Sequence, residues 1–407
     1  SPIVETDTTK EGYEIYPNPH QIDYLTGEFV IRKDVNVVYD STIDAVTKKR
    51  MTEVLESKDK KITISEEVVS GKTNILVGTY LSNEYASNYI QEKNQVDVSL
   101  FEKNDSYFMS AKDGEISILG KNTDAAFYGI TSLKHIFNQM DGSTIKNFEI
   151  KDYADTPIRG FIEGYYGVPW TNEDRMSLMK FGGDFKMTAY IFAPKDDEYH
   201  SLKWRELYPD EKLAEIKELV DVGTATKNKF IWTIHPFLKD GMDFSTEEAY
   251  QAELEKIIAK FEQLYNIGVR QFGVLADDAE GDESNQVKLM EDLEEWRLSK
   301  KDVYNLIFVP KVYTKESAGG DVNNAYLKTI GTMPETVDIM WTGDVILGYV
   351  TQDTFEFFEE AVGRQAFMWL NWPVNDYTDS TLFIGKAEML KKTNKLNGLV
   401  SNPMCEA

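Results

Sequence analysis

Strand-like and helix-like segments alternate regularly along the second part of this chain, from residue 158 to residue 401. The strand-like segments are short apolar runs, and the segments between them repeat apolar residues at helical spacing. Segment 246–267, for example, places Tyr250, Leu254 and Phe261 along one helical face. Such an alternation predicts a parallel sheet that is covered by helices.

The number of segments narrows the choice of fold. Strands are predicted at residues 158–163, 187–192, 229–234, 271–276, 304–312, 336–341, 365–369 and 398–401. Helices are predicted at residues 171–182, 209–226, 246–267, 284–300, 325–332, 352–362 and 382–394, and Thr171 with Asp174 can form a capping box. Eight strands and seven helices match a (β/α)8 barrel of the TIM type, although an open doubly wound sheet alternates similarly. The count of eight and the lack of a Gly-x-Gly-x-x-Gly phosphate loop favour the barrel. Because the chain stops at Ala407, the eighth barrel helix is expected to be missing from it.

A length of 407 residues exceeds one ordinary core, so two domains are expected. Residues 1–150 predict a small mixed α/β domain, and residues 151–407 contain the predicted catalytic barrel. The first domain has predicted strands at 28–32, 35–39, 62–66, 74–77, 106–110 and 115–119, and predicted helices at 43–57, 83–91 and 124–139. Residues 150–157 are predicted as a linker.

Charge limits the partners of the protein. The formal net charge is −25, from 44 basic and 69 acidic residues, so nucleic acid and anionic membranes are poor partners. A polyanion such as hyaluronan would also be repelled unless a local basic patch exists. No run approaches the roughly 18 apolar residues of a membrane span, so membrane insertion is not expected. The single cysteine, Cys405, permits no internal disulfide. No signal peptide is present, and the start at Ser1 without Met indicates a processed or engineered end.

Polar residues follow every predicted barrel strand. In such barrels, chemistry takes place at the carboxyl ends of the strands. These ends carry, in order, Glu163 to Gly167, Ala193 to Asp197, His235-Pro236-Phe237, Asp277-Asp278, Tyr313, Trp341 to Asp344, Asn371 with Asn375-Asp376-Tyr377, and Asn402-Pro403. Loops are usually polar, so one such end is weak evidence. All eight together predict a polar pocket with aromatic walls, which suits a sugar.

Asp277 and Asp278 are adjacent acids at the end of the fourth strand. Neighbouring carboxyl groups oppose each other's ionisation, so one can hold a proton and cleave a glycosidic bond as an acid. Two aspartates before Gly281 are also typical of a turn and a helix cap, so the pair alone does not decide. A calcium-binding loop aligned on Gly281 would lack the acids that bind the ion, and the four histidines lack the spacing of a zinc site. No Gly-x-Ser-x-Gly motif occurs, so a serine nucleophile has no support. No metal and no cofactor are predicted.

Six motifs in a fixed order give the barrel a family resemblance. They are the run RGFIEGYYGVPW from Arg159 to Trp170, Ala193 to Asp197 with Trp204-Arg205-Glu206, Asp277-Asp278, Trp341-Thr342-Gly343, Asn371 with Asn375-Asp376-Tyr377, and Asn402-Pro403 with Cys405-Glu406. Together they strongly resemble glycoside hydrolase family 84, which contains the O-GlcNAcases and bacterial enzymes known as hyaluronidases. Residues 1–150 resemble the α/β domain that precedes the barrel in bacterial members.

The resemblance implies retaining hydrolysis assisted by the substrate, whose 2-acetamido oxygen attacks the anomeric carbon and forms an oxazoline. It implies that Asp277 holds the acetamido N–H, that Asp278 acts as acid and then as base, and that Tyr313 hydrogen-bonds the acetamido oxygen. Substrate contacts are implied for Gly164, Tyr166, Lys195, Thr342, Val345, Trp369, Asn371, Asp376 and Asn402. Without the resemblance, each of these residues could equally be a solvated charge, a core aromatic or a turn residue.

The predicted function is therefore a retaining exo-β-N-acetylglucosaminidase that removes terminal β-linked GlcNAc from glycans or glycoproteins. Two alternatives stay open: an endo-acting hyaluronidase-type glycosidase, which needs an open cleft with a basic rim, and a catalytically silent sugar-binding module. The resemblance alone implies a secreted or cell-surface bacterial protein. The sequence departs from the family pattern at His235-Pro236-Phe237, where Ser-Pro-Gly is usual, at Lys311-Val312, at Val168 and at Ala279-Glu280-Gly281. These departures spare the predicted catalytic groups and affect the leaving-group side.

Overall fold

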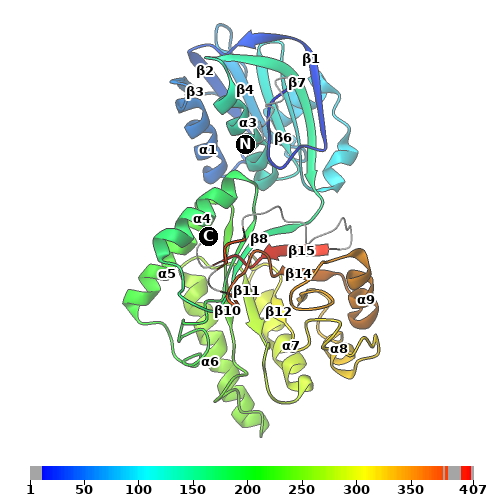
Figure 1. The fold of residues 1–407 in the computed structure, drawn as a ribbon. Coiled ribbons are helices and arrows are strands. Elements are labelled where there is room, and N and C mark those ends of the chain that lie inside the picture. Colours follow the sequence, from blue (N-terminus) through cyan, green and yellow to red (C-terminus); the bar gives the residue numbers. More distant parts are fainter. Residues whose placement is uncertain (1–11, 379–380, 384–395, 405–407) are drawn as a thin grey trace. The chain divides into compact units, whose positions relative to one another are not determined.

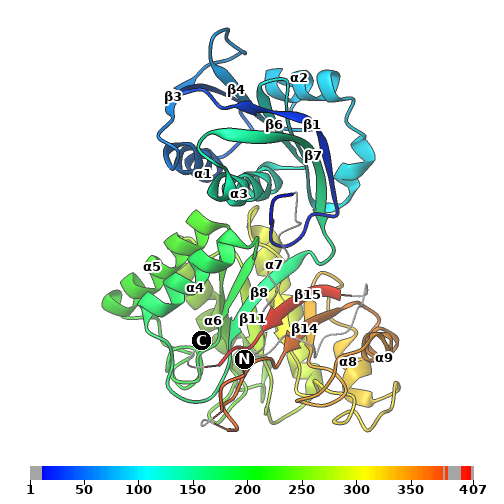
Figure 2. The ribbon, with the colours of Figure 1, turned by 45° about the horizontal axis from the view of Figure 1, so that its top comes forward.

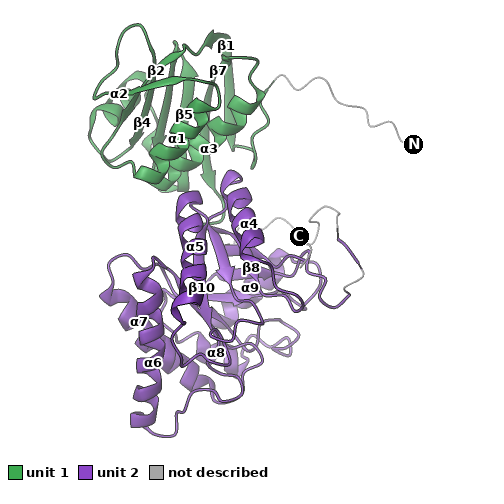
Figure 3. Ribbon diagram, turned by 90° about the vertical axis from the view of Figure 1, so that its left-hand side faces the viewer, with its two compact units in different colours: residues 1–157 green, residues 158–407 purple. Residues whose placement is uncertain are grey.

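The computed structural model describes residues 12–378, 381–383 and 396–404, which belong to two compact units (Figure 3). The first unit is Ser1–Pro157 and the second is Ile158–Ala407. The domain boundary predicted at residue 150 falls inside strand β7 (Thr144–Ala154), so much of the predicted linker is strand. Charged residues that alternate with Phe148 and Ile150 face outward along β7, and this alternation is the strand signal that the linker prediction overlooked.

The first unit is a seven-stranded mixed sheet with helices on both faces (Figure 2). Within the described part of this unit, the strand order is β1-β7-β5-β6-β4-β2-β3, and the strands besides β7 are β1 (Gln21–Val30), β2 (Asp34–Tyr39), β3 (Lys61–Ile64), β4 (Thr73–Thr79), β5 (Asn104–Lys112) and β6 (Glu115–Gly120). Helices α1 (Ala45–Glu56) and α3 (Thr123–Gln139) pack on one face. Helix α2 (Tyr85–Asn94) and the short 3-10 helix η1 (Val98–Glu102) pack on the other.

The second unit is a closed barrel of parallel strands (Figure 1), which confirms the predicted (β/α)8 fold. Its described strands follow chain order around the barrel, and the last pairs with the first. They are β8 (Ile158–Glu163), β9 (Ala189–Phe192), β10 (Lys229–Ile234), β11 (Phe272–Leu275), β12 (Ile307–Val309), β13 (Asp338–Trp341), β14 (Ala366–Leu370) and β15 (Leu396–Ser401).

The described barrel helices agree with the predicted ones to within a few residues at each end. They are α4 (Asn172–Asp184), α5 (Asp210–Thr226), α6 (Glu247–Asn266), α7 (Glu283–Ser299), α8 (Ala325–Ile330) and α9 (Gln352–Val362). The helix predicted at residues 382–394 lies almost entirely outside the described residues. Among the helices that the structure describes, none has the length and apolar character needed to cross a membrane.

Small and branched apolar side chains fill the inside of the barrel. This interior cluster includes Ile162, Ile191, Ile231, Leu275 and Val400, all of which are buried. The opposite faces of the same strands pack against the surrounding helices in a second, larger cluster. Because the middle of the barrel is filled, a ligand site is expected at the ends of the strands.

Helix α4 begins at the predicted capping box. The hydroxyl of Thr171 accepts a hydrogen bond from the Asp174 backbone N–H at 3.2 Å, and the Asp174 carboxylate accepts one from the Thr171 backbone N–H at 3.3 Å. Two N–H groups that the helix itself cannot satisfy are thereby paired. The box fixes the end of the β8–α4 loop, which carries Gly164 and Tyr166.

Candidate active site

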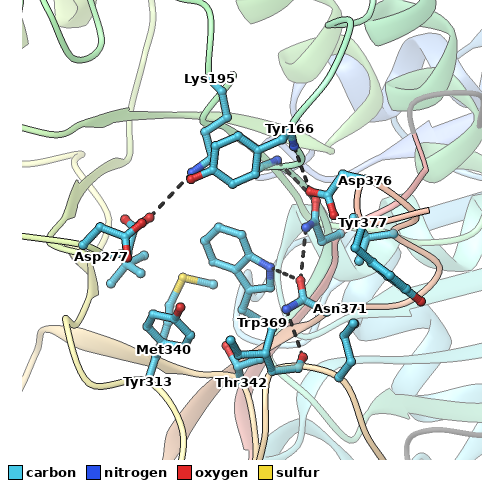
Figure 4. A pocket seen from close by; sticks show the side chains of 17 residues that line it. Tyr166, Lys195, Asp277, Tyr313, Met340, Thr342, Trp369, Asn371, Asp376 and Tyr377 are labelled. Atoms are coloured by element: carbon cyan, nitrogen blue, oxygen red, sulfur yellow. Dashed lines mark hydrogen bonds and ion pairs between the residues drawn. The ribbon is translucent and has the colours of Figure 1, made fainter. Parts of the chain in front are cut away.

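A cavity of about 260 Å³ opens at the carboxyl ends of the barrel strands (Figure 4). It is lined by Gly164, Tyr166, Lys195, Asp277, Asp278, Val309, Tyr313, Met340, Thr342, Ile346, Leu347, Trp369, Asn371, Val374, Asp376, Tyr377 and Asn402. The structure therefore brings together every residue that the sequence predicted for the site, with the exception of Val345.

Asp277 and Asp278 occupy a tight turn directly after β11. The Ala279 backbone N–H donates to the Ala276 carbonyl oxygen at 3.1 Å, which closes the turn around both acids. Asp278 has a φ of 57°, a left-handed conformation that disfavours most side chains but that aspartate tolerates better than most. The pair therefore forms the predicted turn and also lines the cavity, whereas the residue that caps α7 is Asp282.

The turn places the two acids in different surroundings. The Asp277 side chain is 16% exposed, while Asp278 is exposed. The Lys195 ammonium lies 3.6 Å from Oδ2 of Asp277 (Figure 4). The other carboxylate oxygen, Oδ1, is buried and makes no hydrogen bond within the described residues. A buried oxygen of this kind is expected to have a partner, so Oδ1 is available to an N–H group of a ligand.

His235 directly follows β10 and contacts Asp277, although it does not itself line the cavity. Its Nε2 lies 2.7 Å from the Asp277 carbonyl oxygen and 3.5 Å from Oδ1 of the same residue. Burial lowers the pKa of His235, so the ring is neutral at pH 7. The short contact to a carbonyl oxygen assigns the proton to Nε2, which donates, and leaves the buried Nδ1 unprotonated.

Tyr313 lies beyond β12 on the wall of the cavity. Burial raises the pKa of its hydroxyl, and the negative charges of Asp278 and Asp277 raise it further. The Tyr313 hydroxyl therefore keeps its proton at neutral pH and can donate a hydrogen bond to a ligand oxygen. Its backbone carbonyl accepts a hydrogen bond from the Thr342 N–H at 2.8 Å, which joins the two strand ends.

Trp369 is held in place by asparagine side chains and by a glycine. Its indole N–H donates to Oδ1 of Asn371 at 2.9 Å, and Asn402 Nδ2 donates to the same oxygen at 3.1 Å. Oδ1 of Asn402 accepts from the Gly164 N–H at 3.3 Å. A Cβ at Gly164 would lie 2.6 Å from Cζ2 of Trp369, so only glycine leaves room for the indole. The ring is thus a fixed, flat wall on which a sugar face can pack.

The rim of the cavity joins the loop after β8 to the segment after β14. The Tyr166 N–H donates to Oδ2 of Asp376 at 2.9 Å (Figure 4). Tyr166 is 59% exposed, and the centroid of its ring lies 5.0 Å from the Lys195 ammonium, a distance typical of a cation–π contact. An aromatic ring, a cation and a carboxylate are therefore placed where sugar hydroxyls could be bound.

Some residues of the quoted motifs lie outside the cavity lining and support it. Glu163 is 1% exposed and pairs with Arg175 at 2.7 Å, and the Tyr190 hydroxyl donates to the same carboxylate at 2.6 Å. Burial, the largest effect, raises the pKa of Glu163 despite these partners. Asp197 accepts a hydrogen bond from the Tyr208 hydroxyl at 2.7 Å. These groups hold the ends of β8 and β9.

The model of a protein family described as β-N-acetylglucosaminidase matches residues 159–407. The chain belongs to this family, glycoside hydrolase family 84. A second model, described as domain 2 of glycosyl hydrolase family 20, matches residues 12–153. The family 84 resemblance predicted from the strand-end motifs is therefore confirmed.

Relatives and solved structures agree with the family 84 assignment. The mouse and rat proteins named O-GlcNAcase are each 26% identical over 264 residues, which is 61% of this chain and 28% of theirs. The chain thus spans little more than a quarter of the length of these relatives. A structure titled CpGH84D is 66% identical with a TM-score of 0.96, covering 97% of this chain and 66% of that chain. A structure titled CpGH84B is 29% identical with a TM-score of 0.87, covering 97% of this chain and 68% of that chain.

Val345 is the predicted site residue that does not line the cavity of this family 84 barrel. Its side chain is turned toward Gly348, where a Cβ would approach Cγ2 of Val345 to 2.7 Å. Its neighbours Ile346 and Leu347 line the cavity instead. Both are exposed apolar residues, at 52% and 39%, and apolar residues in a loop after a strand end are a signal that could have identified them.

Proposed function

We propose that this protein is a retaining exo-β-N-acetylglucosaminidase that uses its substrate's own acetamido group as the nucleophile. The observation that carries the proposal is the buried Oδ1 of Asp277, which accepts no hydrogen bond from the described residues, beside the exposed Asp278 in a cavity with an indole wall. Family membership supports the sugar, because the matching model is described as β-N-acetylglucosaminidase. The substrate would carry terminal β-GlcNAc on a glycan or glycoprotein.

The first step breaks the glycosidic bond. Oδ1 of Asp277 accepts the acetamido N–H, which orients the acetamido oxygen toward C1 and makes it a better nucleophile. That oxygen forms a bond to C1 as the bond from C1 to the leaving oxygen breaks, and Asp278 gives its proton to the leaving oxygen. The charge that develops on the resulting oxazoline is stabilised by the Asp277 carboxylate, with the Tyr313 hydroxyl donating to the acetamido oxygen.

The second step restores the enzyme. Asp278, now a carboxylate, takes a proton from water, and the water oxygen forms a bond to C1 as the bond from C1 to the acetamido oxygen breaks. The acetamide is regenerated, and two inversions give a product of retained β configuration. Neither aspartate becomes bonded to the sugar, which agrees with the 16% exposure of the Asp277 side chain.

The size of the cavity supports removal of a single terminal sugar. Its volume of about 260 Å³ is below the roughly 300–1,000 Å³ of typical small-molecule pockets, so it has room for one sugar unit. The hydrogen bond from the Tyr166 N–H to Asp376 joins two segments of its rim. An endo-acting hyaluronidase would need a longer cleft with basic residues, and the net charge of −25 disfavours its polyanionic substrate. A silent sugar-binding module would have no need for an exposed acid held in a left-handed turn.

Turnover of chromogenic substrates tests the proposal. We expect the wild-type protein to hydrolyse an aryl β-GlcNAc and to leave hyaluronan intact. Asp278→Asn should lower kcat/KM by about 10²–10⁴-fold with a poor leaving group and by much less with a good one, since a good leaving group needs no acid. Asp221→Asn, in an exposed ion pair on α5, is the matched control and should have wild-type activity. Equal losses with both leaving groups would contradict the acid role.

The place where the protein acts is a separate proposal that rests on the family resemblance alone. We propose a secreted or cell-surface location in a bacterium. Fractionation of the producing cells, with detection of the protein by antibody, should place it in the medium or the surface fraction. Detection in the cytoplasmic fraction alone would contradict this proposal.

A further inference from the structure

A second cavity, of about 950 Å³, lies between the β10–α6 loop and the β11–α7 loop. Asp278 is the residue that lines both this cavity and the sugar cavity. An acid that protonates the glycosidic oxygen must contact an atom bonded to both the sugar and the leaving group. With the sugar in the smaller cavity, the leaving group therefore begins at Asp278 and can extend into the larger one.

We propose that this second cavity binds the aglycone and selects a peptide that carries a basic side chain next to the glycosylated serine or threonine. The inference rests on the proposed function and names its substrate class. It follows from the charge, the apolar residues and the fixed shape of the cavity, which are taken in turn below.

The rim of the aglycone cavity is acidic. Asp240, Glu280 and Asp282 line it together with Asp278, and Lys239 is the basic residue in the same lining. Asp240, Glu280 and Asp282 are all exposed, and hydrogen bonds from Ser284 lower the pKa of Asp282. Several carboxylates against one ammonium attract a cationic group and repel an anionic one.

The lining of the aglycone cavity also contains a group of apolar residues. Phe237, Leu238, Met242 and Phe244 line it, and Phe244 stacks on Tyr250 with ring centroids 5.2 Å apart. Lysine and arginine combine a long apolar stem with a cationic head, so they match a cavity whose lining combines apolar and acidic residues. A sugar aglycone has no such stem, which is why a peptide is favoured.

The shape of the aglycone cavity is fixed before a ligand binds. Arg205 donates to the carbonyl oxygens of Asp240 at 2.7 Å and Gly241 at 2.8 Å, and its Nε lies 2.8 Å from the carboxylate of Glu253. Met242 N–H donates to the Pro236 carbonyl oxygen at 2.9 Å, which closes the loop. A preformed loop loses little freedom when a peptide binds, so its charges can discriminate between peptides.

Matched glycopeptides test the inference. Three peptides with GlcNAc on one serine would differ only in the next residue, which is lysine, alanine or glutamate. At low salt, we expect kcat/KM of the wild-type protein to be about tenfold higher for the lysine peptide than for the glutamate peptide, with alanine between them. The ratio should shrink to about twofold in Asp240→Asn/Glu280→Gln and in 0.5 M salt, where charges are screened. Because the readout is a ratio, it does not depend on the overall activity of a variant.

The general acidity of the protein needs its own control. The control Glu291→Gln/Glu295→Gln changes two exposed residues of α7 that do not line the cavity. Like Asp240→Asn/Glu280→Gln, it removes two negative charges and changes the net charge from −25 to −23. We expect this control to keep the tenfold ratio. Equal ratios in the two double variants, or no preference in the wild type, would overturn the inference while aryl β-GlcNAc turnover persists. If the wild-type protein did not hydrolyse aryl β-GlcNAc at all, the proposed function itself would be overturned.

Discussion

The ring nitrogen Nε2 of His235 lies 2.7 Å from the backbone carbonyl oxygen of Asp277. This carbonyl belongs to the peptide bond between Asp277 and Asp278, so one hydrogen bond from the end of β10 orients the turn that holds both acids. His235 does not line the sugar cavity and would act by positioning.

His235→Ala should therefore lower kcat on aryl β-GlcNAc by about tenfold, which is the effect of one hydrogen bond of about 1.4 kcal/mol. His235→Gln offers an amide N–H at a similar distance from the backbone and should recover most of this loss. Thermal unfolding of both variants would separate positioning from stability. If His235→Ala and His235→Gln were equally stable and had the same kcat, the hydrogen bond would have no role in positioning.

Acidification should remove the stability that the buried neutral histidines contribute. His200 is 3% exposed, its Nδ1 lies 2.6 Å from the Thr233 carbonyl oxygen, and burial lowers its pKa to about 4. The unfolded chain binds a proton near pH 6.5 and the folded chain does not, so stability is lost as pH falls from about 6.5 toward 4.

Urea unfolding at pH 7 and pH 5 measures this effect. At pH 5 the loss attributable to His200 should be about 2 kcal/mol, and His200→Asn should show a correspondingly weaker pH dependence. His235 adds to the loss in the same direction, because burial also lowers its pKa. Because burial raises the pKa of Asp338 to about 7 and this carboxyl stabilises the fold as pH falls, the readout is the difference between wild type and variant. Equal pH dependence in the wild type and His200→Asn would contradict the buried neutral state of His200.

Gly164→Ala should displace the indole wall, because the added Cβ would lie 2.6 Å from Trp369. We expect a several-fold rise in KM for aryl β-GlcNAc and a destabilisation of about 1–3 kcal/mol, as in other overpacked sites. Trp369→Phe removes the atoms in conflict. The double variant should therefore lose less than the sum of the two single variants, and strict additivity would argue against the clash.

Glu163→Gln should mainly reduce stability. It leaves the Arg175 guanidinium, whose side chain is 11% exposed, without its carboxylate, and breaking a buried pair typically costs about 3–5 kcal/mol. Chemical denaturation would measure this loss, with Asp221→Asn in the exposed pair with Lys217 as a control that loses at most about 0.5 kcal/mol. A control that lost as much as Glu163→Gln would show that burial does not matter here.

The sequence was sufficient for the barrel because its strands are short apolar runs that alternate with helices, and the predicted site residues lie at or beyond the carboxyl ends of these strands. Part of β7 was predicted as a linker, although the alternation of charged and apolar residues along it is a strand signal. Val345, Ile346 and Leu347 show a different limit. A motif identifies a loop, but the backbone geometry after Gly343, whose φ is 128°, determines which loop side chains face the cavity.

His235 could be recognised from sequence only as a strand end. Its importance depends on a contact to a backbone atom, and such a contact leaves no pattern in side-chain types. The aglycone cavity is a similar case. Asp240, Glu280 and Asp282 come from two loops that no spacing rule connects, so their common location became visible only in three dimensions.

The hydrogen bond between Gly164 and Asn402 joins residues that are 238 positions apart in the chain. It forms across the seam where β15 meets β8, so the wall around Trp369 is complete only after the last strand has closed the barrel. Recovery of hydrolysis during refolding would then require the pairing of β15 with β8, and a chain that stops before β15 would be inactive even if its other strands had assembled.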